Sequence, residues 1–554
     1  MQTKIKQPIC RYIAILFWIS FCARGGVAQS NMVPQDASVE TPVINSASDT
    51  ASILRELQVM KGRIAELENQ LRKAQSASYE TAPDDAARLQ AARNALLTGN
   101  HASRDPDPTL ADARRSTVPA ETSAALPTPS HREKAQPFAF ADFTWLNGNP
   151  RIEQAPYDTK FFTPEVRADV DYTYDFRHPQ DDTIGGSSEV FRANEVQLTQ
   201  LGVGGDFHYE NVRARLMTQF GMYATTTPRN DASYSRGNWD LADAYRYLSE
   251  AYGGYHFDAL HGINVDAGIF MSYVGLFSYY NFDNWAYQPS YVSSNTPWFF
   301  TGVRTQIFLT DKLKIEPWFV NGWQSYGRYN NRPGIGGQIL WRPNGQVSVL
   351  GNQYALGEDT LGNPGRVRYH TDDSVQYKYY GNPIGRHLSQ GAFSLTGDAG
   401  CEHGGGVSCA GGSPKGPKQS FLGFMLYNRL WFDRNLFGVT LGGGRINNPG
   451  RYLVLLPPIN GATASSGTSY FTENPGDKFK AWDGSATFDY MPRQYITWRM
   501  EYNHRVADVP YFSGPGGITP PGGDQGAPGS LVPGWGPDLR KSENRMTGAV
   551  LVMF

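Results

Sequence analysis

The sequence predicts an all-β fold, a transmembrane antiparallel β-barrel of about 16 strands, preceded by an α-helical coiled coil. Three observations support this prediction. From about Phe138 to the last residue, apolar and polar side chains alternate along segments of strand length. Short links and long Gly-, Pro- and Asn-rich connections alternate between these segments. Nearer the N-terminus, an apolar repeat of seven residues is typical of a coiled coil.

The composition favours a membrane barrel over a soluble enzyme. The 554 residues include 13% aromatic and only 18% charged residues. After the N-terminal segment there is no run of about 18 apolar residues, so the sequence excludes helical membrane spans. The net charge of −2 gives no reason to expect a nucleic-acid partner.

Residues 1–28 have the features of an export signal. Basic residues precede an apolar stretch at 12–23, and small residues at 26–28 fit a cleavage site before Gln29. A single membrane anchor is one alternative, although the apolar run is short for it. A lipoprotein modified on Cys22 is another. Export predicts a barrel in the bacterial outer membrane, with the N-terminal region in the periplasm.

A linker at 29–51 leads to a predicted periplasmic coiled coil at 52–75. Glu56 and Lys61 have opposite charges and the g-to-e spacing of a parallel coiled coil between identical chains. We therefore expect a homo-oligomer, with a trimer favoured; a lone amphipathic helix is the alternative. The seam consists of Ile53, Leu57, Met60, Ile64, Leu67 and Leu71.

Residues 76–136 form an Ala- and Pro-rich linker with room for one short helix, and 137–554 form the barrel. Phe138 to Trp145 are expected outside the wall, as a plug or lead-in segment. The sixteen predicted strands lie at 163–176, 192–207, 211–224, 244–258, 262–274, 297–310, 312–324, 334–342, 346–357, 366–380, 388–397, 419–432, 435–446, 479–491, 495–508 and 544–554.

The alternation also predicts which face of each strand meets lipid. In 166–176, Tyr172 and Tyr174 share a face opposite Arg167 and Asp169. Lipid offers no hydrogen-bond partners, so strands in it must close into a barrel. About sixteen strands enclose an interior too wide for side chains to fill, which makes the polar faces the lining of a water-filled channel.

Charged side chains of both signs are candidates for the pore lining. Across the lumen they would create a transverse field, or else they pair across strands and only keep the lumen wet. The aromatic-rich segment 276–298 is the candidate constriction; an external lid is the alternative. The candidate residues are Arg167, Asp169, Asp171, Arg213, Arg215, Asp266, Tyr279, Tyr280, Trp285, Arg304, Lys314, Glu316, Lys378, Arg499 and Glu501.

Two cysteines remain after signal removal, Cys401 and Cys409, in a Gly-rich stretch. An even, close pair in an exported protein favours a disulfide. A metal site that also uses His403 is the alternative, but it falls short of four ligands.

The chain from 138 to 554 resembles the OmpL-like β-barrel porin family. The resemblance is carried by Phe143-Thr144-Trp145-Leu146-Asn147-Gly148, Tyr279-Tyr280-Asn281-Phe282-Asp283 and Arg368-Tyr369-His370-Thr371-Asp372-Asp373-Ser374. The terminal Phe554 is also typical of bacterial outer-membrane proteins. The resemblance implies an outer-membrane porin and indicates no particular solute.

These observations together predict passive diffusion of small hydrophilic solutes such as ions, sugars or organic acids. The alternative is an outer-membrane anchor, tethered to peptidoglycan through the N-terminal coiled coil. The scattered His residues and the lack of a visible nucleophile–base grouping argue against an enzyme. We expect no cofactor, and only lipid, solute, peptidoglycan or a second copy as partners.

Overall fold

The computed structural model describes residues 137–554, except for 154, 229–230, 232–236, 329, 358–364, 383, 413, 450–477, 519–535 and 537. It also describes Gln58, 61–63, Glu66 and Asn69, which are helical and exposed. The seam positions of the predicted coiled coil, the export signal and both linkers lie outside the described residues. None of the helices in the described part of the chain is long and apolar enough to cross a membrane.

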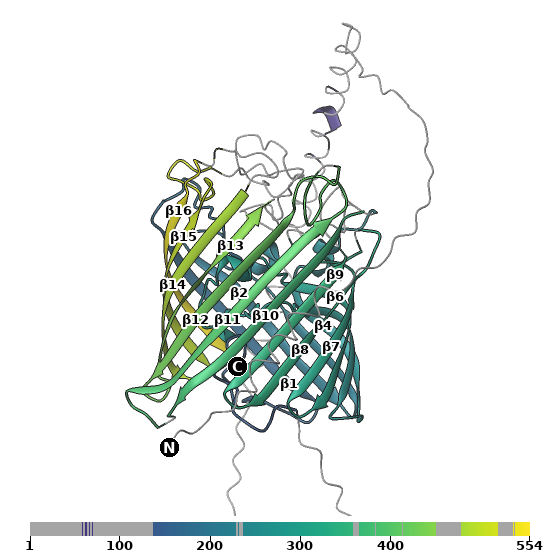
Figure 1. Ribbon diagram of the computed structural model, residues 1–554, viewed down its shortest axis with the longest axis vertical. Coiled ribbons are helices and arrows are strands. Elements are labelled where there is room, and N and C mark those ends of the chain that lie inside the picture. Colours follow the sequence, from purple (N-terminus) through teal and green to yellow (C-terminus); the bar gives the residue numbers. More distant parts are fainter. Residues whose placement is uncertain are drawn as a thin grey trace, which may run out of the picture. The chain divides into compact units, whose positions relative to one another are not determined.

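Sixteen antiparallel strands form the barrel, as the sequence predicts (Figure 1). They are β1 (Phe162–Asp175), β2 (Val196–Tyr209), β3 (Val212–Thr218), β4 (Leu248–Phe257), β5 (Ile263–Met271), β6 (Phe299–Thr310), β7 (Leu313–Val320), β8 (Gly334–Asn344), β9 (Val347–Leu356), β10 (Val367–Gly381), β11 (Leu388–His403), β12 (Ser420–Phe432), β13 (Phe437–Pro449), β14 (Lys478–Arg493), β15 (Ile496–Ala507) and β16 (Ser542–Met553).

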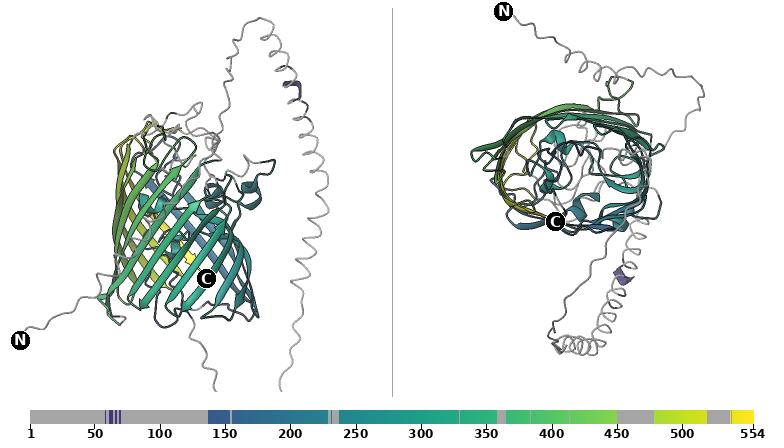
Figure 2. Two further views of the ribbon diagram at one scale, coloured as in Figure 1. Left: turned by 45° about the vertical axis from the view of Figure 1, so that its right-hand side comes forward. Right: turned by 90° about the horizontal axis from the view of Figure 1, so that it is seen from below.

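Each strand pairs with its neighbours in sequence, and β1 pairs with β16 to close the barrel. The last residue takes part in this closure, because the backbone N–H of Phe554 donates to the carbonyl of Val166 at 2.9 Å. The view along the barrel in Figure 2 shows the closed ring of strands. With an even strand count, β1 begins and β16 ends on the side of the short links.

Burial alternates along the strands in the predicted sense, polar side chains inward and apolar ones outward. On β1, Arg167, Asp169 and Asp171 are buried, whereas Tyr172 between the polar positions is exposed. The same alternation is seen on β10 and β15. A soluble protein has the opposite arrangement, with apolar side chains inside. The outward apolar surface therefore fits a lipid environment.

Several strand ends differ from the prediction, and the difference is largest in two strands. The strand predicted at 211–224 ends at Thr218, because Gly221 adopts φ +92° and helix α4 (Tyr223–Thr226) follows. The strand predicted at 388–397 continues to His403, because its pairing with β10 extends that far. The apolar pattern continues past the end of β3 and fades before the end of β11, so backbone conformation and strand pairing, not the pattern, set these two ends.

A short segment covers part of the outer wall near the long connections. Helix α5 (Leu241–Tyr245) lies in the connection between β3 and β4, and its residue Tyr245 stacks near Tyr326. Ile269 on β5 belongs to the same apolar cluster and is only 6% exposed. Its side chain therefore packs against protein, whereas the alternation alone predicts contact with lipid.

Candidate pore constriction

The constriction segment, residues 276–298 between β5 and β6, is almost entirely buried. It contains the 3-10 helix η4 (Asn281–Asp283) and helix α6 (Tyr291–Ser294). Its polar contacts run to inward-facing side chains of β1, β2 and β4 and of β12, β14, β15 and β16. The strands form a ring around these inner segments in the end-on view of Figure 2. The segment thus lies inside the barrel.

Carboxylates of the wall accept hydrogen bonds from the segment. Glu501 on β15 accepts the backbone N–H groups of Tyr287 at 2.6 Å and of Gln288 at 2.8 Å. Asp483 on β14 accepts the backbone N–H of Tyr291 at 3.0 Å. Each anchor satisfies a buried donor that would otherwise lose its water.

Asp169 on β1 also holds the segment, through side chains. It accepts from Asn281 Nδ2 at 2.7 Å and from the Tyr287 hydroxyl at 3.0 Å. Its neighbour Asp171 instead accepts from Thr173 and Thr199, which lie on β1 and β2. One of these two aspartates therefore anchors the segment, and the other stays within the wall.

Arginines of the wall bind the carbonyl oxygens and carboxylates of the segment. Arg167 pairs with Asp283 at 3.1 Å. Arg499 donates to the carbonyl of Asn284 at 2.6 Å while it also pairs with Asp489 on β14 at 2.7 Å. Guanidinium groups suit this role because they carry several donors in fixed directions.

Of the predicted aromatic residues of the segment, Tyr280 and Trp285 are buried and Tyr279 is partly buried. Trp285 is 3% exposed and lies edge-on to Trp431 of β12, with 5.6 Å between the ring centroids. The hydroxyl of Tyr280 donates to Glu250 on β4 at 2.9 Å, and that of Tyr279 donates to Gln219 at 2.5 Å. These rings fill space and fix the segment rather than offering free stacking faces.

The chain before β1 packs against the constriction segment. Trp145 is 1% exposed, and its carbonyl accepts from the indole nitrogen of Trp285 at 3.1 Å. Asn147 bridges two elements: its backbone N–H donates to Gln376 on β10, and its Oδ1 accepts the backbone N–H of Trp285. The expected plug or lead-in segment is thus inside the barrel, docked on the constriction segment.

Other predicted pore residues pair with one another along the wall. Asp266 on β5 lies 3.2 Å from Arg213 and 3.0 Å from Arg304, which come from β3 and β6. On β7, Lys314 bonds to Glu316. The pairs of Asp266 cross strands, as in the alternative of pairing across strands, whereas Lys314 and Glu316 pair within one strand.

Two further predicted pore residues, Arg215 and Lys378, lie near the inner segments of the barrel. Arg215 on β3 pairs with Glu250 at 2.6 Å and with Glu165 at 3.0 Å. Because Glu250 also accepts from the hydroxyl of Tyr280, Arg215 lies next to that hydrogen bond. Lys378 on β10 is half-buried, and its ammonium lies 5.2 Å from the ring centroid of Trp145. Lys378 therefore lies beside the lead-in segment.

Sequence reasoning missed an aromatic cluster whose members come mainly from β4 to β9 and their connections. The guanidinium of Arg304 lies 4.6 Å from the ring centroids of both Tyr252 and Phe270, so it contacts two members of this cluster. The sequence could have indicated that Trp318 faces inward, because it is two residues from the inward-facing Glu316 and shares its strand face. The cluster comprises Tyr252, Phe270, Tyr273, Val274, Phe300, Trp318, Val320, Trp323, Tyr354 and Phe421.

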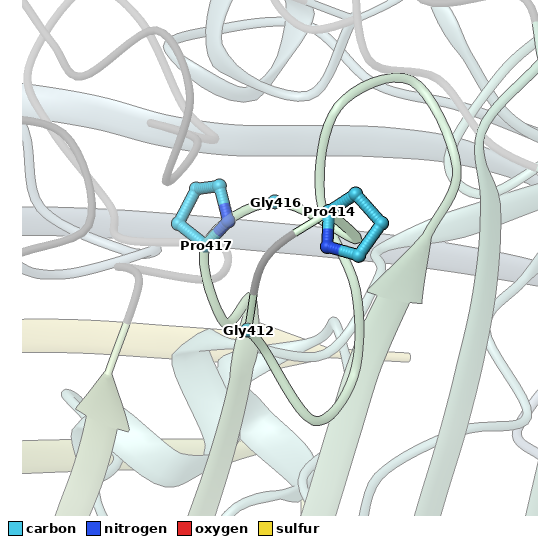
Figure 3. A pocket seen from close by; sticks show the side chains of 4 residues that line it. All are labelled: Gly412, Pro414, Gly416 and Pro417. Atoms are coloured by element: carbon cyan, nitrogen blue, oxygen red, sulfur yellow. The ribbon is translucent and has the colours of Figure 1, made fainter.

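A disulfide joins Cys401, near the end of β11, to Cys409 in the connection between β11 and β12. Both thiols are used in this bond, so they do not form the metal site with His403. Further along the same connection, two glycines and two prolines line an open pocket, with Gly412 and Pro417 among them (Figure 3). This lining has no charged or hydrogen-bonding side chain that would select a polar ligand.

Comparison with solved structures gives distant likenesses to outer-membrane proteins. The outer membrane channel DcaP of Acinetobacter baumannii is 12% identical, with 72% of this chain and 100% of that chain covered and a TM-score of 0.41. A trimer form of OmpT from Vibrio cholerae is 8% identical, with 72% and 100% covered and a TM-score of 0.40. An anion-selective porin from Comamonas acidovorans is 10% identical, with 71% and 99% covered and a TM-score of 0.41.

Likenesses as distant as these say nothing of solute or assembly. Among curated proteins, no relative matches the sequence significantly. A family model, described as "Putative beta-barrel porin-2, OmpL-like", matches residues 167–526, which is more than half of the chain and includes most of β1 and all of β2 to β15. The chain therefore belongs to this OmpL-like family of β-barrel porins.

Proposed function

We propose that the protein is an outer-membrane porin through which small hydrophilic solutes diffuse passively. The observation that carries the proposal is the inverted burial of the wall, with charged side chains such as Arg499 inside and apolar ones such as Met500 outside. A lining of this kind suits water and polar solutes. The constriction segment, held by Glu501 and Asp483, would set how wide that path is.

We further propose that residues 1–28 are removed on export and that 29–136 lie in the periplasm, with a coiled coil at 52–75. Copies would associate through that coiled coil as a homo-oligomer, with three chains favoured. The opposite charges at g and e positions support association of identical parallel chains. Pore-lining roles for the candidate residues are part of the same proposal.

The experiment that tests the pore compares the purified protein with a variant that lacks residues 279–291, in planar bilayers. We expect the wild type to conduct ions and the deletion variant to show a larger single-channel conductance, because wall-bound residues such as Tyr287 are gone. A deletion of equal length at 519–531, in the connection between β15 and β16, is the matched control. Unchanged conductance after deletion of 279–291 would argue against the constriction, and no conductance in any form would argue against the pore.

The second candidate function is a tether between the outer membrane and the cell wall. The heptads in front of the barrel support this proposal, because a periplasmic helix on a membrane-anchored barrel would be able to reach the cell wall. The full protein should then sediment with purified peptidoglycan, and a variant lacking residues 29–136 should not. Equal sedimentation of both forms would exclude the tether.

A further inference from the structure

The outward face of the barrel carries one charge in an unexpected place. Asp373 on β10 is exposed and points outward, and it is the one carboxylate at an outward-facing position among the strand residues that the structure describes. Tyr369 and Tyr377 are exposed at equal distances before and after it on the same face. Tyrosines typically mark the two membrane interfaces, so Asp373 lies within the apolar band between them.

A short chain of hydrogen bonds leads to this carboxylate along the outer surface. The amide Nε2 of Gln353 on β9 donates to Thr371 Oγ1 at 2.6 Å. The hydroxyl of Thr371 in turn donates to Asp373 Oδ2 at 3.1 Å. Polar side chains are costly in lipid, and those found at membrane depth usually face other protein or water. A protein partner would satisfy what these side chains leave unpaired.

The backbone around these polar residues is bare. Gly351 on β9 and Gly397 on β11 are the register partners of Asp373 on its two sides, and Gly337 on β8 is the partner of Gln353. A Cβ added to Gly397 would meet no atom within 4 Å, so this position opens outward. Small residues let two backbones approach closely within a membrane. The strands concerned, β8 to β11, lie together on the near side of Figure 1.

We propose that this patch, defined as Gly337, Gly351, Gln353, Thr371, Asp373 and Gly397, docks against the barrel of a second copy of this chain. The glycines leave the backbone of the patch uncovered, and its polar side chains can form hydrogen bonds. Contact with lipid requires neither feature. The heptads of the same chain supply the partner, because g-to-e charge pairs favour identical chains side by side in one membrane. The inference rests on the membrane-spanning barrel of the proposed function and adds which face of it the copies share.

The test places a photoreactive benzophenone amino acid at position 397 of the full chain in outer membranes. Gly253 on β4 and Gly548 on β16 are matched controls, because both are exposed, outward-facing glycines whose added Cβ would also meet nothing. Irradiation should yield a covalent adduct of two copies from position 397 and none from 253 or 548. No such adduct from 397, adducts of equal yield from the controls, or capture of a different protein would each overturn the proposal.

A second variant needs no photochemistry. Gly397→Trp should fold normally, because the added side chain points into open space, but it should block close docking. We expect its oligomer to dissociate at a lower temperature on non-denaturing gels than the Gly253→Trp oligomer. Identical dissociation would overturn the proposal. Single-channel conductance of the same two variants should stay at the wild-type value, since each barrel encloses its own path, so failure of docking and failure of the pore are distinguishable.

Discussion

The backbone N–H of Trp285 donates to Oδ1 of Asn147 at 2.6 Å, which ties the chain before the first strand to the segment after the fifth. Both residues are buried. The interior of the barrel is thus built from two distant parts of the chain that support each other. The lead-in segment enters the lumen from the short-link side and contacts the constriction segment, which enters between β5 and β6.

Asn147→Ala should loosen this contact, because it leaves the buried N–H of Trp285 without its acceptor. An unpaired buried donor costs about 1–3 kcal/mol. We expect more frequent transitions between conductance levels in single-channel recordings. Asn147→Asp keeps an oxygen in the same place and should behave like the wild type. Equal noise in both variants would show that the hydrogen bond does not matter.

Glu501→Ala should free the middle of the constriction segment, since two consecutive amides lose their acceptor. With about 1–3 kcal/mol lost for each amide, hydrogen exchange at Tyr287 and Gln288 should speed up by about tenfold or more. The matched control is Glu316→Ala, which removes a buried wall carboxylate that bonds to Lys314 and Gln306. If both variants accelerate exchange at Tyr287 equally, the anchor role of Glu501 is wrong.

The connection between β1 and β2 should loosen as the pH rises toward 7. Burial raises the pKa of Glu189 from the ordinary 4.5 to about 7. The hydrogen bonds from Ser188 and Ser187 lower this pKa and offset only part of the rise. The folded loop therefore holds a proton that the open loop has lost, and its stability declines from about pH 4.5 and stops declining above about pH 7. Intrinsic-rate-corrected hydrogen exchange of residues 176–195 at pH 6 and pH 8 measures this. Glu189→Gln should abolish the difference, and a difference that persists in that variant has another source.

Adjacent residues on β6 should report opposite surroundings. A polarity-sensitive dye on Ile307→Cys should be quenched by brominated lipid, because this position faces outward by the strand alternation. The same dye on Gln306→Cys should be quenched by aqueous iodide, because Gln306 bonds inward to Glu316 on β7 at 3.2 Å. If both positions respond alike, the wall is not the boundary between lipid and water.

The wall was predictable from the sequence because each strand carries its own alternation. All sixteen strands were found, and the errors concern ends such as that of β3. Gly221 explains that error: its positive φ breaks a strand whose apolar pattern continues past it. A Cβ there would lie 2.4 Å from the carbonyl oxygen of Leu198, so the position requires glycine.

The interior was only partly predictable. Segment 276–298 stood out through its length and aromatic content, but its anchors did not. Asp483 looks like any inward-facing carboxylate, and its partner Tyr291 is 192 positions away in the sequence. Trp145 is expected outside the wall, as the structure has it, but no local pattern says what a segment before the first strand docks on. Such contacts depend on the closed barrel, which brings these residues together.

This dependence has a consequence for assembly. The bond between Glu501 and Tyr287 joins residues 214 positions apart, and further anchors of the same segment come from β14 and β16. Segment 276–298 leaves the ribosome long before those strands exist. It cannot form these bonds until the C-terminal strands lie beside it, so the final width of the lumen depends on contacts of long sequence separation, which form slowly.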